Sequence, residues 1–281
     1  MNTYFLRFPE GKAKAFTLSY DDGVETDIRF ADLMRANGLK GTFNIGSQCF
    51  APEGTIHPSD AWFRYMTKSQ RAHAYDGMEV AVHGSHHPFL EKLPAPVCIQ
   101  EVLGDRLALE EEYGCLVRGM AYPYGTFSDT VLDVLKLSGI TYSRTTKATH
   151  DFRLPTNWLL LDPTCHHNDP ELFSLCDRFL TGDPADGHNQ SPWMFYVWGH
   201  TYEYDKDNNW DRAEELVKKI SGASDVWYAT NGEIRDYVAA YDSLVFSANG
   251  RRVYNPSVQT VWFIYEGKTY SVKSGETITI D

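Results

Sequence analysis

The chain has 281 residues, of which 42% are hydrophobic and 23% charged, which is typical of a globular protein. Its formal net charge of −12 argues against a nucleic-acid partner, because phosphate backbones are bound by clusters of Lys and Arg. No stretch reaches the roughly 20 apolar residues that cross a bilayer, and the N-terminus lacks the apolar run of a signal peptide. We therefore expect a cytoplasmic protein with no membrane partner. The oligomeric state is left open.

Short apolar runs alternate with helical patterns along most of the chain, which favours βα units and a parallel sheet. The expected strands are residues 15–20, 42–45, 78–82, 118–122, 140–143, 193–198 and 226–229. The expected helices are residues 27–38, 96–113, 128–138, 170–180, 211–220 and 232–242.

After about residue 243 the pattern changes. Aromatic and β-branched residues dominate, and Gly267 and Gly275 stand at turn positions, which predicts a small antiparallel β appendage. We therefore divide the chain into residues 1–242 and an appendage of residues 243–281. The appendage is interpreted as a cover or interaction edge, with a binding module as the alternative.

Ionisable side chains follow several of the expected strands: Asp21 and Asp22, His83 and His87, Tyr124, and His200. In barrels of parallel strands, the loops at the C-terminal strand ends carry the active site. We expect these side chains to converge on one rim.

His83 and His87 are four residues apart, so they would share one face of a helical turn and could bind one metal ion. Together with Asp22 they form a set of three ligands that leaves a position open for water or substrate. His86 is a competing ligand. Because the side chains of neighbouring residues diverge, the other carboxylate, that of Asp21, could face a water molecule and act as a base. A strand-exit turn and a solvated histidine cluster are the alternatives for these motifs.

His200 ends an apolar strand and is a candidate general acid or base, with a structural histidine as the alternative. His166 and His167 are interpreted as walls of a pocket. The sequence has no GxSxG, GxGxxG or GxxxxGK[ST] motif, so serine-nucleophile, dinucleotide and P-loop chemistry have no support.

The combined motifs resemble those of the polysaccharide deacetylase family, also described as the NodB-homology domain or the family 4 carbohydrate esterases. The matching segments are Thr17–Gly23 (TLSYDDG), Thr42-Phe43, Gly77–Val80 with His83–Pro88, Pro123–Gly125 and Trp198–His200. The resemblance covers about residues 14–240.

This resemblance implies an α/β fold, a distorted (β/α)7 TIM-like barrel, and a divalent metal held by Asp22, His83 and His87. The metal is expected to be Zn²⁺, with Co²⁺, Ni²⁺ or Mn²⁺ as alternatives. The resemblance also implies that Asp21 is the general base and His200 the general acid.

The implied partner is an acetylated carbohydrate. The backbone N–H of Tyr124 is implied as a donor to the oxyanion. The expected substrate contacts are Pro123, Tyr124, His166, His167 and Trp198.

The sequence departs from the family pattern in three places. Gly84 stands where the family has Ser or Thr after the first histidine, and Ala121 stands in place of an Arg in the third motif. The Asp-x-x-Asp-Trp motif is missing from residues 157–167, where it should lie. Because the Arg and its Asp partner are lost together, we expect His166 or His167 to hold Asp21.

We predict a metal-dependent hydrolase that removes acetyl groups from an N-acetylated carbohydrate, an oligosaccharide or polysaccharide deacetylase. A small intracellular oligosaccharide or acetylated sugar is expected as the substrate in preference to a wall polymer. An O-acetyl carbohydrate esterase is one alternative, since an alkoxide leaving group demands less of His200. A non-catalytic carbohydrate-binding protein on a decayed barrel is the other. The intact pair of Asp21 and Asp22 argues against it, because a binding protein has no use for a base beside a metal.

Overall fold

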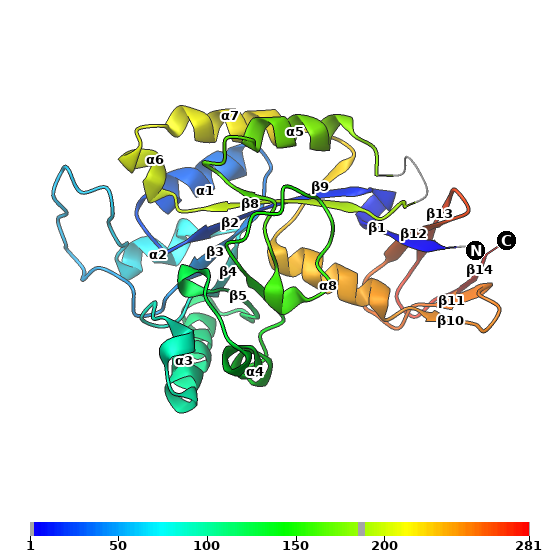
Figure 1. Ribbon diagram of the computed structural model, residues 1–281, viewed down its shortest axis with the longest axis horizontal. Helices are drawn as coiled ribbons and strands as arrows, with labels where there is room; N and C mark the ends of the chain where they lie inside the picture. The colour runs from blue at the N-terminus through cyan, green and yellow to red at the C-terminus, as the bar shows by residue number, and fades with distance from the viewer. Residues whose placement is uncertain (1–2, 185–188, 281) are drawn as a thin grey trace.

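The structure, a computed structural model, describes residues 3–184 and 189–280. A curved sheet lies at its centre, helices cover the sheet, and a small β unit forms one end of the molecule (Figure 1). In the sheet the strand order is β6-β5-β4-β3-β2-β8-β7, and β9 also pairs with β2. The pairings are parallel throughout this part of the structure. The predicted fold class, a distorted barrel of βα units with a small β appendage, is confirmed.

The strands of this sheet are β2 (Lys14–Asp21), β3 (Gly41–Ile45), β4 (Glu79–Val82), β5 (Gly119–Ala121), β6 (Tyr142–Arg144), β7 (Cys165–His166), β8 (Trp193–Gly199) and β9 (Val226–Tyr228). Strand β2 is buried along its whole length. It pairs with β8 on one side, and on the other side with β9 near its start and β3 near its end. The carboxyl end of β2 therefore lies in the middle of the sheet.

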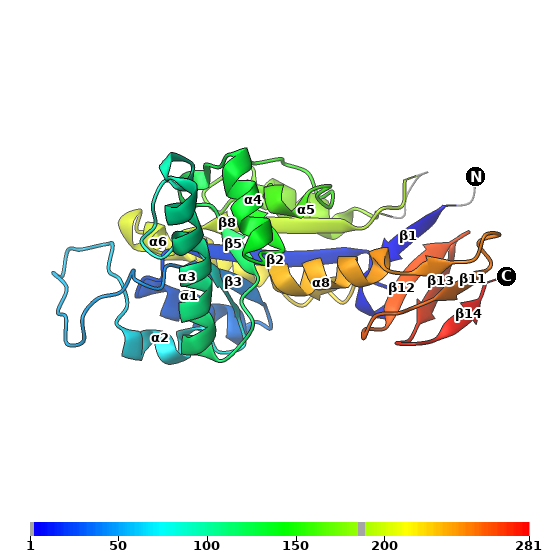
Figure 2. The same ribbon diagram turned by 90° about the horizontal axis from the view of Figure 1, so that it is seen from below.

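The helices are α1 (Thr26–Ala36), α2 (Lys68–Ala74), α3 (Ala95–Tyr113), α4 (Asp129–Leu137), α5 (Leu172–Thr181), α6 (Tyr202–Lys206), α7 (Trp210–Ile220) and α8 (Asn231–Asp242). Short 3₁₀ turns lie at Pro9–Gly11, Leu90–Lys92, Pro123–Gly125 and Trp158–Leu160. Helices α5 and α7 pack together over one side of the sheet, while α3 and α4 lie together on the other (Figures 1 and 2). Among the described residues, none of the helices combines the length and apolar character needed to cross a membrane.

The C-terminal unit is built from antiparallel strands: β10 (Val245–Phe246), β11 (Arg252–Tyr254), β12 (Val261–Tyr265), β13 (Lys268–Val272) and β14 (Thr277–Thr279). Glu266 and Gly267, both with positive φ, form the two-residue turn between β12 and β13. An unpredicted strand, β1 (Tyr4–Arg7), pairs with β12, so an N-terminal strand forms part of this C-terminal unit (Figure 2). The predicted boundary at residue 242 stays a prediction.

Candidate active site

The side chains expected at the strand ends do gather around one cavity. It has a volume of about 250 Å³ and lies at the carboxyl ends of β2, β4, β5 and β8. Its lining residues are Asp21, Asp22, His83, His87, Tyr122, Tyr124, Gly125, Thr146, Trp198, His200 and Tyr202.

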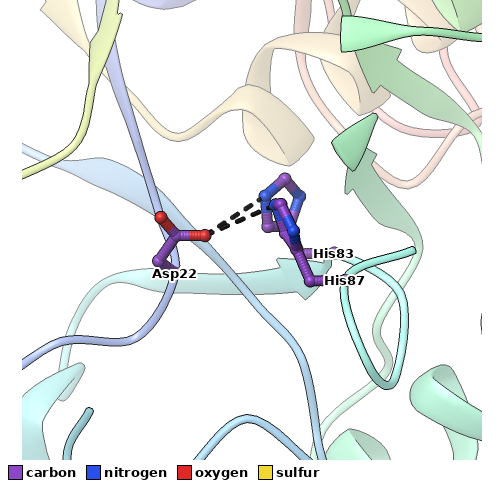
Figure 3. A group of neighbouring side chains, drawn as sticks. All are labelled: Asp22, His83 and His87. Carbon is purple, nitrogen blue, oxygen red and sulfur yellow. Dashed lines mark ion pairs between the residues drawn. The ribbon is translucent and has the colours of Figure 1, made fainter. Parts of the chain in front are cut away.

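Asp22, His83 and His87 point toward one another (Figure 3). The Oδ1 atom of Asp22 lies 3.6 Å from the Nε2 atoms of both histidines. This distance is too long for a hydrogen bond. It is close to the roughly 3.3 Å that separates ligand atoms around a tetrahedral zinc ion with bonds of about 2.0 Å.

The tautomer of His83 also suits a metal ligand. Its Nδ1 atom lies 2.8 Å from the carbonyl oxygen of Ala121, so Nδ1 carries the proton and Nε2 has a free lone pair. The competing ligand His86 is 66% exposed and contacts Glu101 instead of the other histidines. The three residues Asp22, His83 and His87 therefore fit a divalent metal ion.

A tight turn, not a helical one, brings the two histidines together, so that part of the prediction is wrong. Gly84 has a φ of 75° and His87 one of 55°, and the His87 N–H donates to the carbonyl of Gly84. Asp22 and Tyr124 also have positive φ. Such a conformation costs a non-glycine residue roughly 1 kcal/mol or more, and three of the residues that bear this cost line the cavity.

Asp21 is held by two donors from other strands of the sheet, one on β3 and one on β6. Asn44 donates to its Oδ1 atom at 2.8 Å, and the buried guanidinium of Arg144 donates to its Oδ2 atom. Burial alone would raise the pKa of Asp21, but the positive charges of Arg144, His83 and His200 outweigh it and lower the pKa.

Arg144 thus does what was expected of His166 or His167, and that expectation is wrong. Arg144 stands at the end of β6, so the expectation that functional side chains follow strand ends could have identified it. Its guanidinium lies over the ring of Trp198, 4.3 Å from the ring centre.

His200 lies between carboxylates. Its Nε2 atom is 3.9 Å from Oδ2 of Asp21 and 4.0 Å from Oδ2 of Asp22, while its Nδ1 atom bonds Glu203 at 3.3 Å. Burial alone would lower the pKa of His200, but the three carboxylates outweigh it and raise the pKa. Glu203 was missed by the sequence reasoning. Its position three residues after His200, at the start of α6, was the available signal.

His166 and His167 lie behind this pair and do not line the cavity. Their Nε2 atoms are 3.1 and 2.9 Å from Oε2 of Glu203. The Asn168 N–H donates to Nδ1 of His166, which leaves the proton of His166 on Nε2, facing Glu203. Both imidazoles therefore approach the same carboxylate oxygen more closely than the histidines around Asp22 approach theirs.

His167 is fully buried and stacks on the ring of Tyr204. Burial lowers the pKa of His167 to about 4. Burial would raise the pKa of Glu203, but its contacts with the three histidines outweigh burial and lower it strongly. His167 therefore supports Glu203 and is out of reach of a substrate.

Of the other expected substrate contacts, two line the cavity and one does not. Tyr124 and Trp198 line the cavity, whereas Pro123 is buried and does not. The Tyr124 ring is 52% exposed, stacks on Phe89 with ring centres 3.8 Å apart, and contacts His87. Tyr202, which was not predicted, also lines the cavity, and its ring packs against that of His200. Aromatic rings thus contact both His87 and His200 at the cavity.

Comparison with known proteins agrees with the motifs. The model of the family described as Polysaccharide deacetylase matches residues 9–143, and the resemblance inferred from the motifs is confirmed. Among curated proteins, none matches this chain.

Among solved structures, a candidate polysaccharide deacetylase from Mycobacterium smegmatis is 16% identical. It has a TM-score of 0.57, and the match covers 86% of this chain and 96% of that one. The deacetylase PplD of Streptococcus pyogenes, in complex with acetate, is 19% identical with a TM-score of 0.45, and the match covers 51% of this chain. This chain spans only 61% of PplD. A CE4-family pseudoenzyme from Bacillus anthracis is 14% identical with a TM-score of 0.47, over 83% of this chain and 68% of the other. The first of these likenesses shows a shared fold.

Proposed function

We propose that this chain, whose residues 9–143 match the polysaccharide deacetylase family, is a metal-dependent hydrolase that removes acetyl groups from an N-acetylated carbohydrate. One observation carries the proposal. A carboxylate paired with an arginine, Asp21, and a histidine backed by a carboxylate, His200, stand beside the three metal-ligand candidates. This arrangement supplies a base and an acid at one cavity.

Asp22, His83 and His87 would hold the metal, for which Zn²⁺ suits the donor set best, with Co²⁺, Ni²⁺ or Mn²⁺ as alternatives. When bound, such an ion polarises the acetyl carbonyl and lowers the pKa of a coordinated water toward about 7.

Asp21 accepts a proton from the attacking water. Arg144 and Asn44 fix its carboxylate and keep it ionised, so it is ready to act at neutral pH. The backbone N–H of Tyr124 remains the proposed donor to the oxyanion.

His200 donates a proton to the departing amine, which is too basic to leave as an anion. The carboxylate of Glu203 holds the imidazole in orientation and favours its protonated form. This pairing supports amide cleavage over the alternative of O-acetyl ester cleavage, because an alkoxide needs less help in leaving. The complete acid and base pair likewise argues against a carbohydrate-binding protein without activity.

The test is acetate release from a panel of N- and O-acetylated sugars, before and after chelation and return of zinc. We expect chelator-sensitive release from the N-acetylated members. Asp21→Asn should lower turnover by at least ~100-fold and still bind zinc, whereas His83→Ala should lose zinc.

The outcomes separate the alternatives. Release from O-acetylated sugars alone would favour the esterase. Sugar binding without release, with zinc bound, would favour the binding protein. Equal zinc loss in both variants would contradict the division of roles between Asp21 and its neighbour.

A further inference from the structure

Helix α3 contacts the turn that carries the two histidine ligands. Its buried stripe consists of Cys98, Val102, Asp105 and Leu109, so a carboxylate occupies a position otherwise filled by apolar side chains. Burying a carboxylate is costly unless it is hydrogen-bonded. The position of Asp105 therefore calls for partners, and it has them at the candidate site.

The side chain of Asp105 binds the backbone of two neighbouring segments. Its Oδ2 atom accepts from the His83 N–H at 3.1 Å, and its Oδ1 atom accepts from the Ser47 N–H at 2.6 Å. The carboxylate thus joins the residue that follows β4 to the loop that follows β3.

Glu101, one turn earlier on α3, binds the middle of the same turn. Its carboxylate accepts from the His86 N–H at 2.9 Å and contacts Nδ1 of His86 at 2.8 Å. Its backbone carbonyl accepts from the Ser85 N–H at 3.1 Å. The backbone N–H groups of His83, Ser85 and His86 therefore all donate to α3.

Gly84, within this turn, has no side chain that could brace it. It stands where the family has a hydroxyl side chain that could brace the turn, and its φ of 75° favours glycine. A Cβ atom there would lie 3.2 Å from Pro88 and 3.5 Å from Pro123. A side chain at this position would be strained by the positive φ and tight against Pro88, and the side-chain acceptors for this turn come from α3.

We propose that Glu101 and Asp105 are positioning residues that set the spacing of His83 and His87 and so preorganise the metal site. The proposal rests on the proposed function, because it assumes that these histidines bind a metal. Removing groups that orient metal ligands commonly lowers metal affinity by about 10- to 100-fold.

The experiment measures zinc affinity of the full chain by competition with a chromogenic chelator, together with hydrogen exchange over residues 83–87 in the metal-free protein. Glu101→Ala and Asp105→Ala should bind zinc about 10- to 100-fold more weakly and lose amide protection in this turn. Glu101→Gln should stay within about threefold of the unaltered chain, because an amide oxygen still accepts from the His86 N–H. Glu111→Ala, an exposed position on the same helix, is the matched control.

The two failures are distinguishable. If the unaltered chain binds none of Zn²⁺, Co²⁺, Ni²⁺ and Mn²⁺, the proposed function fails and the inference fails with it. If it binds zinc but Glu101→Ala behaves like Glu111→Ala in affinity and exchange, only the inference is overturned. Should Asp105→Ala not fold, the comparison of the two Glu101 variants decides, because both retain Asp105.

Discussion

At the scale of single residues, Arg144 balances a buried charge. It is fully buried, as is Asp21, and breaking such a pair from one side leaves an uncompensated charge in the interior. We expect Arg144→Leu to lose about 3–5 kcal/mol of unfolding free energy and at least ~100-fold in kcat/KM, measured by urea unfolding and acetate release.

Arg118→Leu is the control for that change, since its ion pair with Asp236 is partly exposed and such pairs contribute at most about 1 kcal/mol. Adding Asp21→Asn to Arg144→Leu should recover part of the lost stability, because the unpaired charge is removed. Equal stability losses in the Arg144 and Arg118 variants would contradict this account.

Glu203 acts on the other member of the proton-transfer pair. Its negative charge favours protonated His200, so Glu203→Gln should lower the pKa of His200. Because the acid must be protonated, the alkaline limb of the kcat/KM profile should move to lower pH. At pH 8 the loss should be about 10- to 100-fold.

Glu215→Gln, an exposed change on α7, should leave the same profile in place. A uniform loss of activity at every pH, with the alkaline limb unmoved, would mean that Glu203 only supports the local structure.

At the scale of elements, the first turn of α1 carries a buried acid that joins three segments. Asp27 accepts from the Val24 N–H, the Tyr75 hydroxyl and the Thr201 hydroxyl. Thr201 directly follows His200, so this cluster helps to place the end of β8. Burial raises the pKa of Asp27 to about 7 despite these hydrogen bonds.

The sign of the resulting pH dependence follows from that raised pKa. Between the unfolded pKa of about 4 and the folded value near 7, the folded state holds a proton that the unfolded state has released. The contribution of Asp27 to stability is therefore lost as pH rises through this range. Relative to Asp27→Asn, the chain should lose roughly 2–3 kcal/mol of unfolding free energy from pH 5 to pH 7.

Urea unfolding at a series of pH values checks this. Asp32→Asn, on the exposed side of the same helix, should keep the pH dependence of the unaltered chain. If Asp27→Asn and Asp32→Asn show the same dependence of unfolding free energy on pH, the pKa of Asp27 is not raised in the folded chain, and this account is wrong.

An element can be predicted from the sequence when its pattern lies within one contiguous and sufficiently long segment. The long apolar run of β8 and the motif residues Asp22 and His83 follow from contiguous patterns and strand ends. Strand β7 and helix α6 span only two and five residues, too few to show a period, so Glu203 on α6 was missed.

Arg144 was missed for a related reason. It comes from a three-residue strand, and its partner Asp21 is 123 residues away, so no local pattern joins them. His166 and His167 were assigned to Asp21 because they stand where the missing motif should lie. In the folded chain both histidines instead contact Glu203 on α6.

At the scale of the whole molecule, an N-terminal strand links the C-terminal appendage to the barrel. β1 pairs with β12 and leads through Phe8 into β2, whose eight residues run roughly 25 Å toward the candidate site. The Trp262 N–H on β12 donates to the Tyr237 hydroxyl on α8 at 3.0 Å. The appendage is thus bound to the barrel by a strand and by a helix.

Cutting the chain after Asp242 tests whether residues 1–242 are an independent unit. The cut removes the partner of β1 and uncovers Leu6 and its neighbours, which are buried in one cluster with Tyr237. Exposing buried apolar side chains costs about 1.5–3 kcal/mol each, so Tm should fall by about 10 °C. Zinc affinity should stay within about threefold, because the candidate ligands lie at the far end of β2. An unchanged Tm would contradict this account and mean that the appendage is an independent unit. Loss of zinc binding would mean that the appendage stabilises the whole barrel, including the candidate site.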